Sequence, residues 1–243
     1  MDLKVIGSGS KGNAYLLENG QEALLIECGV NFKDIRIALN FDLSKLSGCI
    51  ITHEHKDHSK SINELLSAGV NVWATKGTHE ACETLNHHRA YILKYHVPAP
   101  IGNFRVSPFD VGHDANEPCG FLINHEQTGN VLFLTDLIYS KYTFKNLNNI
   151  IIEANYDPKI AKRKLGDKEF LRNRIINFHM SIDTCIDQLK ANDLSSVNNI
   201  VLIHLSDSNS NEDDFKRRVE NATGKTITVA DKGIEIKFNK TPF

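Results

Sequence analysis

Short apolar runs separated by turn residues recur along the chain and predict alternating strands and helices. The first of these runs have the pattern of a β-meander, and Asn31 is suited to cap the first helix. The expected strands are Leu3–Ile6, Ala14–Leu17, Ala23–Ile26, Leu46–Thr52, Val70–Ala74, Gly120–Ile123, Val131–Leu134, Ile150–Glu153, Ile200–His204 and a final pair within Thr226–Phe238. The expected helices are Asn31–Leu39, Ser59–Ala68, Thr78–Leu85, a basic stretch that runs to about Ile176, Ser181–Lys190 and Glu212–Val219.

A less regular stretch separates the third helix from the strand at Gly120. It holds Pro98, Pro100 and Pro108, which mark loops and strand edges. Strands and helices alternate on both sides of it, without a low-complexity linker and without a repeat of about 20–50 residues. The predicted fold class is therefore α/β, with two sheets packed between outer helices in one domain over residues 1–243.

The composition narrows the function classes. Of the 243 residues, 41% are hydrophobic and 24% are charged, and no apolar run approaches the roughly 18 residues of a membrane span. Lys+Arg 28 against Asp+Glu 30 gives a net charge of −2, which argues against the strong overall positive field of a dedicated nucleic-acid binder. The basic stretch Lys159–Arg174 could still attract a polyanion, although a solvated helix face is the more common explanation.

The cysteines and histidines add two expectations. Five cysteines without a CxxC pair, and an N-terminus that runs directly into a predicted strand, indicate a reducing compartment and no signal peptide. We therefore expect a cytoplasmic protein that has no membrane partner. The 11 histidines are unevenly distributed, and the densest group points to metal chemistry.

That group is His53-Glu54-His55-Lys56-Asp57-His58, directly after the expected strand Leu46–Thr52. Residues two apart on an extended segment point the same way, so His53 and His55 can bind one metal ion together. Asp57 and His58 follow after the chain turns and can serve a second metal. Imidazole and carboxylate ligands suit Zn²⁺, and also Mn²⁺ or Fe.

A site for two metals needs more ligands from other strand ends, and three residues meet this condition. His113, Asp136 and His204 each follow an apolar run that reads as a strand. Taken alone, each is more often an ordinary loop residue than a ligand. Together with the histidine motif, they complete a plausible ligand set along one edge of a sandwich.

In their order along the chain, these motifs resemble those of the metallo-β-lactamase-fold hydrolases. The resemblance covers nearly the whole chain and is closest to the YycJ/WalJ-like subgroup, with phage anti-Pycsar cyclic-nucleotide phosphodiesterases as similar proteins. It implies an αββα sandwich of two mixed β-sheets flanked by helices. The segments that carry it are Ile6–Asn13, Leu24–Gly29, Thr52–His58, His113–Pro118, Leu134–Asp136, Ile152–Asn155, Phe178–Ser181 and His204–Ser206.

The resemblance also implies two divalent metal ions, Zn²⁺ or alternatively Mn²⁺, with Asp136 bridging them. The ligands would be His53, His55, His113 and Asp136 for the first ion, and Asp57, His58, Asp136 and His204 for the second. Three places depart from the family pattern: Glu27 replaces the usual Asp, Leu137 replaces a Thr-Gly continuation, and Met-Ser-Ile-Asp follows His179 in place of a Gly-His-Leu-Ser-Asn pattern. Relatives commonly pair, so we expect a homodimer.

Two metals a few ångströms apart can activate water and polarise a phosphoryl oxygen, so phosphodiester hydrolysis suits such a site, with lactam hydrolysis as the rival chemistry. By resemblance to the phosphodiesterases, Glu153 orients His179, and His179 gives a proton to the leaving oxygen. Asp57 would help to orient the attacking group. The alternative for His179 is a structural role before a helix capped by Ser181.

Candidate substrate ligands are Ser10, Asn13 and Ser206. The first two belong to the glycine-rich segment Ser8–Asn13, whose backbone N–H groups could form an anion-binding nest or could simply make a turn between strands. Ser206 is a candidate phosphate ligand by resemblance.

Three functions are consistent with these residues. The preferred hypothesis is a dinuclear-metal phosphodiesterase that opens cyclic mononucleotides such as cCMP, cUMP, cAMP or cGMP, because net charge −2 and the absence of a long insertion favour a small substrate. With this activity, the chain could serve as a phage protein that evades Pycsar defence. The alternatives are a YycJ/WalJ-like exonuclease on DNA, with nucleic acid as the partner, and a non-catalytic metal-binding scaffold.

Overall fold

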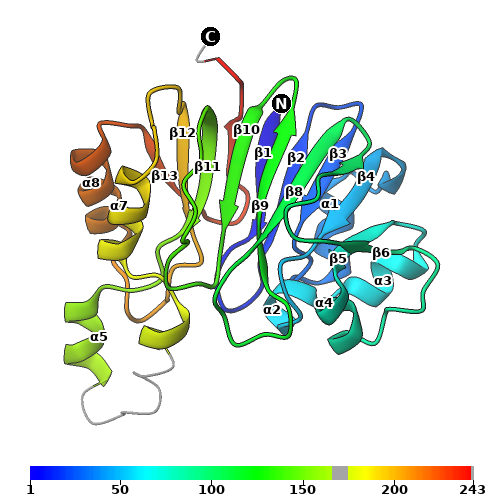
Figure 1. The fold of residues 1–243 in the computed structure, drawn as a ribbon, viewed down its shortest axis with the longest axis horizontal. Helices are drawn as coiled ribbons and strands as arrows, with labels where there is room; N and C mark the ends of the chain where they lie inside the picture. The colour runs from blue at the N-terminus through cyan, green and yellow to red at the C-terminus, as the bar shows by residue number, and fades with distance from the viewer. Residues whose placement is uncertain (166–174, 242–243) are drawn as a thin grey trace.

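Two β-sheets pack face to face between outer helices in the computed structural model, which describes residues 1–165 and 175–241 (Figure 1). The strand orders are β14-β1-β2-β3-β4-β5-β6 in one seven-stranded sheet and β13-β12-β11-β10-β9-β8-β7 in the other. The first sheet comprises β1 (Asp2–Gly7), β2 (Ala14–Glu18), β3 (Ala23–Ile26), β4 (Leu46–Ile50), β5 (Val72–Thr75), β6 (Ala90–Leu93) and β14 (Glu235–Lys237). The second comprises β7 (Ala99–Ile101), β8 (Phe104–Asp110), β9 (Cys119–His125), β10 (Gly129–Leu134), β11 (Leu147–Glu153), β12 (Asn199–Ile203) and β13 (Ile227–Val229).

The helices cover the outer faces and one edge of this sandwich. In the part of the chain that the structure describes, none of them is both long and apolar enough to cross a membrane. The predicted α/β class, with two mixed sheets flanked by helices, is confirmed. The helices are α1 (Phe32–Ala38), η1 (Leu43–Lys45, a 3₁₀ helix), α2 (Lys56–Ser59), α3 (Ile62–Ser67), α4 (Lys76–Ala81), α5 (Pro158–Leu165), α7 (Ile182–Lys190) and α8 (Glu212–Thr223).

The strands are apolar on both faces because each sheet packs on the other sheet on one side and on helices on the other. In β2, Tyr15 and Leu17 belong to the core between the sheets, whereas Leu16 packs outward with Ile35 of α1 and Leu65 of α3. The second sheet is built in the same way, with α7 and α8 on its outer face. This two-sided burial explains why the strands read as continuous hydrophobic runs.

Parallel pairing brings several strand ends to one edge of the molecule. β3, β4, β5 and β6 run parallel to one another, and so do β10, β11, β12 and β13. The segments that follow β4, β10 and β12 carry the histidine and aspartate motifs of the sequence. These ends lie near α2 and α5, at the lower edge of the view in Figure 1.

The proline-containing stretch is more regular than expected, because it forms β6, β7 and β8. Pro100 lies in β7, which is the edge strand of its sheet, where a residue without an N–H group is tolerated. The expected final pair of strands also differs, because β13 joins β12 in one sheet and β14 joins β1 in the other. The segment between them therefore crosses from sheet to sheet.

Several expected helices differ in their bounds: the one expected over Thr78–Leu85 is Lys76–Ala81 in α4, and the one expected over Glu212–Val219 extends to Thr223 in α8. The helix expected from Ser59 begins at Lys56 as α2, and a break before Ile62 separates it from α3. The basic helical stretch is described as far as Leu165 and again from Ile175, which is helical, so Lys168, Arg172 and Arg174 lie outside the described residues. Asn31 precedes α1 as expected, but its side chain makes no capping hydrogen bond.

Candidate metal centre

Strand ends from both sheets deliver the motif residues to one place. The segment after β4 carries His53 and His55, and the short helix α2 that follows carries Asp57 and His58. The second sheet supplies His113 from the β8–β9 loop, Asp136 after β10, Glu153 at the end of β11 and His204 after β12, while His179 comes before α7. The structure thus brings together all the residues that the sequence predicted as metal ligands.

A first group of donor atoms consists of His53, His55, His113 and Asp136, whose ligand atoms lie within 4.8 Å of one another. Nδ1 of His55 lies 3.1 Å from Nε2 of His53 and 3.2 Å from Nε2 of His113. Oδ2 of Asp136 lies 3.3 Å from Nε2 of His53. Three imidazole nitrogens and one carboxylate oxygen that converge in this way form a donor set suited to Zn²⁺ and related ions.

A second group consists of Asp57, His58, Asp136 and His204, again within 4.8 Å. Nε2 of His58 lies 2.9 Å from Oδ2 of Asp136 and 3.5 Å from Oδ2 of Asp57. Nε2 of His204 lies 3.5 Å from the same Asp57 oxygen. Asp136 belongs to both groups, so its carboxylate lies where two ions would share a ligand.

The charges in the second group also fit a cation. Burial acts to raise the pKa of Asp136, but His204 and His58 outweigh it and hold that pKa well below its usual value. Burial acts to lower the pKa values of His58 and His204, but Asp136 and other carboxylates raise both well above the usual value. Protons on these imidazoles therefore compensate the buried carboxylates, and a divalent cation would replace them.

In the first group the histidine pKa values shift in the opposite direction. Burial lowers the pKa of His53, and it lowers the pKa of His113 to about 4. Both rings are therefore neutral at physiological pH, which is the form that binds a metal ion. The donor sets of both groups fit a divalent cation.

Glu153 and His179 adjoin the second group. Oε1 of Glu153 lies 2.7 Å from Nδ1 of His179, and Oε2 accepts hydrogen bonds from the backbone N–H groups of Leu137 (3.2 Å) and Met180 (3.3 Å). Burial acts to lower the pKa of His179, but Glu153 and Asp136 raise it to about 9. The fully buried carboxylate thus fixes the ring through Nδ1 and leaves Nε2 as the nitrogen available to a ligand.

The backbone at this edge is strained at two of the ligand candidates. Asp136 has φ 49° and His204 has φ 55°, in the left-handed region that costs a residue other than glycine about 1–3 kcal/mol. Two hydrogen bonds hold His204 there: its N–H donates to Oγ of Ser8 (3.0 Å), and its carbonyl accepts from Nδ2 of Asn155 (2.8 Å). Strain of this kind persists where the surrounding structure fixes the conformation, as it does here.

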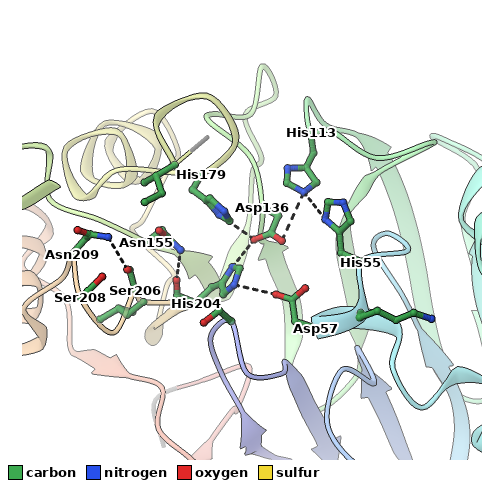
Figure 2. A pocket seen from close by; sticks show the side chains of 14 residues that line it. His55, Asp57, His113, Asp136, Asn155, His179, His204, Ser206, Ser208 and Asn209 are labelled. Carbon is green, nitrogen blue, oxygen red and sulfur yellow. Dashed lines mark hydrogen bonds and ion pairs between the residues drawn. The ribbon is translucent and has the colours of Figure 1, made fainter. Parts of the chain in front are cut away.

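An open pocket of about 500 Å³ lies over the two groups. Figure 2 shows His55 and His113 on one side of Asp136, and Ser206 and Asn209 on the other. The residues that line it are Ser10, His55, Lys56, Asp57, His113, Asp136, Asn155, Ile175, His179, His204, Leu205, Ser206, Ser208 and Asn209. Ser10 and Ser206, the two serines expected as substrate ligands, thus lie in the pocket wall.

Asn13 differs from expectation, because its side chain is buried and serves the structure of its own loop. Oδ1 accepts from the N–H of Gly9 (2.8 Å), and Nδ2 donates to the carbonyl of Asp57 (3.2 Å) and lies 3.2 Å from Nε2 of His58. The N–H groups of Gly9, Gly12 and Asn13 all donate to acceptors within the protein. These three N–H groups are therefore occupied, and the contacts of Asn13 with Asp57 and His58 support α2.

Glu27 and Gly29 form the floor beneath α2. The Glu27 carboxylate is buried, accepts from the N–H of Thr52 (3.3 Å) and lies 3.6 Å from Nδ1 of His58, so it reaches the motif despite replacing the usual Asp. At Gly29 the chains approach so closely that a Cβ atom would lie 1.7 Å from the carbonyl oxygen of Asp57. Only glycine fits this contact.

Several pocket residues were not predicted from the sequence. Asn155 lies in a motif segment, and its position directly after a strand was the available signal. Lys56, Ile175, Ser208 and Asn209 come from loops or helix ends without a periodic pattern. These residues reach the pocket through the tertiary path of the loops, which no local sequence pattern indicates.

Comparison with known proteins agrees with this fold. A family model described as the β-lactamase superfamily domain matches residues 23–205. Exodeoxyribonuclease WalJ of Streptococcus pneumoniae serotype 2 (strain D39 / NCTC 7466) is 26% identical over 251 residues, which cover 96% of this chain and 91% of that protein. Exodeoxyribonuclease YycJ of Bacillus anthracis is 27% identical over 174 residues, covering 67% of this chain and 66% of that protein.

Among solved structures, the metallo-β-lactamase fold protein YhfI from Bacillus subtilis superposes with a TM-score of 0.76. The match covers 97% of this chain and 98% of YhfI at 18% sequence identity. A likeness at this identity establishes the fold. The expected resemblance to YycJ/WalJ-like proteins of the metallo-β-lactamase fold is confirmed.

Proposed function

Because the chain belongs to the β-lactamase superfamily, we propose that it is a metal-dependent phosphodiesterase that removes nucleotides from the ends of DNA. The observation that carries the proposal is the pair of donor groups sharing Asp136 at the base of an open pocket, with the Glu153–His179 pair beside them. The choice of DNA rests on the relatives, which are named exodeoxyribonucleases and align with 96% of this chain in the case of WalJ.

In this proposal His53, His55, His113 and Asp136 hold one divalent ion, and Asp57, His58, Asp136 and His204 hold the other, with Zn²⁺ preferred and Mn²⁺ as the alternative. When bound, such ions supply the Lewis acidity that activates water and polarises a phosphoryl group. The buried carboxylate of Asp136 and the floor beneath α2 keep the two donor groups at a fixed separation.

Residues of the chain then orient the phosphate and supply a proton to the leaving oxygen. Water adds to phosphorus and releases one proton to solvent, the bond to the sugar oxygen breaks, and that oxygen takes a proton from Nε2 of His179, which solvent then replaces. Glu153 holds the His179 ring through Nδ1 at 2.7 Å, so the proton is presented on the other nitrogen. Ser10 and Ser206 lie in the pocket wall, where their hydroxyl groups would donate to the phosphate oxygens.

A cyclic mononucleotide is the second candidate substrate, and two features of the pocket are compatible with it. The pocket volume of about 500 Å³ suits a single nucleotide. Among the described residues that line it, Lys56 carries the only permanent positive charge. An exonuclease also admits only the terminal nucleotide, so these features do not separate the two substrates, and the names of the relatives favour DNA.

The test is to incubate the purified protein and Mn²⁺ or Zn²⁺ with end-labelled single- and double-stranded DNA and, separately, with cCMP, cUMP, cAMP and cGMP. We expect stepwise release of mononucleotides from DNA, and loss of this activity with EDTA and in His58→Ala. His88→Ala is the matched control, because this exposed histidine is not among the pocket residues and should leave activity unchanged. Opening of cyclic nucleotides with intact DNA would contradict the DNA proposal and support the second candidate.

A further inference from the structure

Helix α5 presents a concentrated positive charge. Its sequence Pro158-Lys-Ile-Ala-Lys-Arg-Lys-Leu165 contains four cations and no acidic residue. Lys159, Lys162, Arg163 and Lys164 are all exposed, whereas Ala161 is buried. The helix therefore has one face packed on the protein and a charged face toward solvent.

The packed face joins α5 to the wall of the pocket. Ala161 packs with Tyr156 and Ile175, and Ile175 itself lines the pocket. Nζ of Lys164 donates to the carbonyl oxygen of Ser208 at 2.5 Å, and Ser208 also lines the pocket. These two contacts set the basic helix beside the pocket, at the edge of the molecule where Figure 1 shows α5.

The start of α5 is held rigidly. Oδ1 of Asp157 accepts from the N–H groups of Lys159 (2.6 Å) and Ile160 (3.2 Å), and Oδ2 pairs with Arg218 at 2.9 Å. The negative charge of Asp157 is thereby compensated by Arg218 of α8. The Asp157 carboxylate therefore pairs with the first turn of α5 and with Arg218, and among the residues that the structure describes it makes no ion pair with the cations of α5.

Three of the cations share one side of the helix. Lys159, Lys162 and Arg163 are spaced i, i+3 and i+4, so they lie in one stripe. Lys159 and Arg163 are four residues apart, which is about 6 Å along the helix axis, and one DNA strand carries a phosphate about every 3.4 Å along the duplex axis. The stripe is therefore long enough to contact about three successive phosphates.

We propose that this stripe binds the phosphate backbone of a DNA strand whose end lies in the pocket. The inference rests on the proposed function, because a cyclic mononucleotide has no further phosphates to reach the stripe. In this arrangement α5 contacts the phosphates of the DNA strand, and the pocket holds its terminal nucleotide. A solvated helix face without a ligand is the competing explanation, and it predicts no effect of these charges on DNA.

The experiment measures binding of fluorescent single-stranded DNA by anisotropy in EDTA, so that no cleavage occurs, at 50 and 200 mM salt. The variant is Lys159→Gln, Lys162→Gln, Arg163→Gln. Three lost contacts should reduce the salt slope by about 2, so that four-fold more salt weakens wild-type binding about 16-fold more than variant binding. The variant carrying Lys159→Arg, Lys162→Arg and Arg163→Lys keeps the charges and should retain the wild-type slope.

A matched control removes three cations at the far end of the sheets, by Lys225→Gln, Lys237→Gln and Lys240→Gln. It should leave the slope unchanged, whereas an equal reduction in this control would mean a general charge effect. An unchanged slope in the α5 variant overturns the inference. DNA that binds with the expected slope but is not cleaved when metal is restored contradicts the proposed function and leaves the α5 inference supported.

Discussion

Replacing Glu153 by Gln tests whether this buried carboxylate acts through His179 on the leaving group. The two side chains have nearly the same shape, so packing is preserved. The carboxylate faces donors on both oxygens: Nδ1–H of His179 on Oε1, and two backbone N–H groups on Oε2. A Gln side chain has only one acceptor oxygen, so one side must face its amide N–H₂ group.

The free-energy cost of the substitution depends on whether His179 or the two backbone N–H groups lose their acceptor. If the Gln oxygen faces His179, the N–H groups of Leu137 and Met180 are unpaired, at roughly 1–3 kcal/mol each. If the oxygen faces the backbone, the amide N–H₂ group opposes Nδ1 of His179 and drives the proton of the neutral ring onto Nε2. In both cases the negative charge that holds the protonated ring is lost, and we expect a loss of about 10²–10⁴ in the rate of general-acid catalysis.

The assay compares two leaving groups on the same enzyme. DNA releases a sugar oxygen that needs a proton, whereas a p-nitrophenyl nucleotide ester releases a stable anion that does not. Glu153→Gln should therefore lower kcat by about 10²–10⁴ on DNA and far less on the ester. Glu126→Gln, at an exposed turn, is the matched control. Equal losses on the two substrates would refute the proton-transfer role and leave a purely structural one.

The remaining predictions concern stability and metal content. Gly29→Ala should lower the melting temperature and the metal content measured by mass spectrometry, because its Cβ would overlap the Asp57 carbonyl; unchanged values would contradict the close approach. Metal at 100 times its dissociation constant should stabilise the protein by about 2.7 kcal/mol, and thermal melts in which EDTA lowers Tm would show this. Burial acts to raise the pKa of Glu22, but hydrogen bonds from Asn103 and His125 hold it below its usual value. Its stabilising contribution is therefore present above the unfolded-state pKa and lost as pH falls through the folded-state pKa, so denaturant titrations should show the advantage of wild type over Glu22→Gln shrinking in acid.

The ligand candidates could be predicted because their signals are local. His53 and His55 are two residues apart after a strand, so they point the same way. Asp136 and His204 each follow an apolar run, so both are expected at the end of a strand. Parallel pairing within each sheet then brings these ends together. No knowledge of long-range contacts was needed beyond the sandwich itself.

The role of Asn13 could not be predicted in the same way. Its partners, the carbonyl of Asp57 and the ring of His58, lie 44 and 45 residues away in sequence. A glycine-rich turn followed by Asn has the same local pattern whether its polar groups face a ligand or the protein. The strand β7 was missed for a related reason: Pro100 is unfavourable inside a sheet but acceptable at an edge, and edge position is a property of the assembled sheet.

The net charge of −2 was the main sequence observation against DNA, and the structure shows why it has little weight. Charges separated by more than about 8–10 Å are largely screened at physiological salt, so a bound strand responds to nearby groups and not to the sum over the chain. The acidic residues Glu212, Asp213 and Asp214 lie at the start of α8. Four cations lie on α5, which contacts the pocket residues Ile175 and Ser208. The sum over the whole chain is close to zero although α5 alone carries four positive charges. The position of a charge relative to the pocket therefore decides between a polymer and a single nucleotide, and only the fold supplies that position.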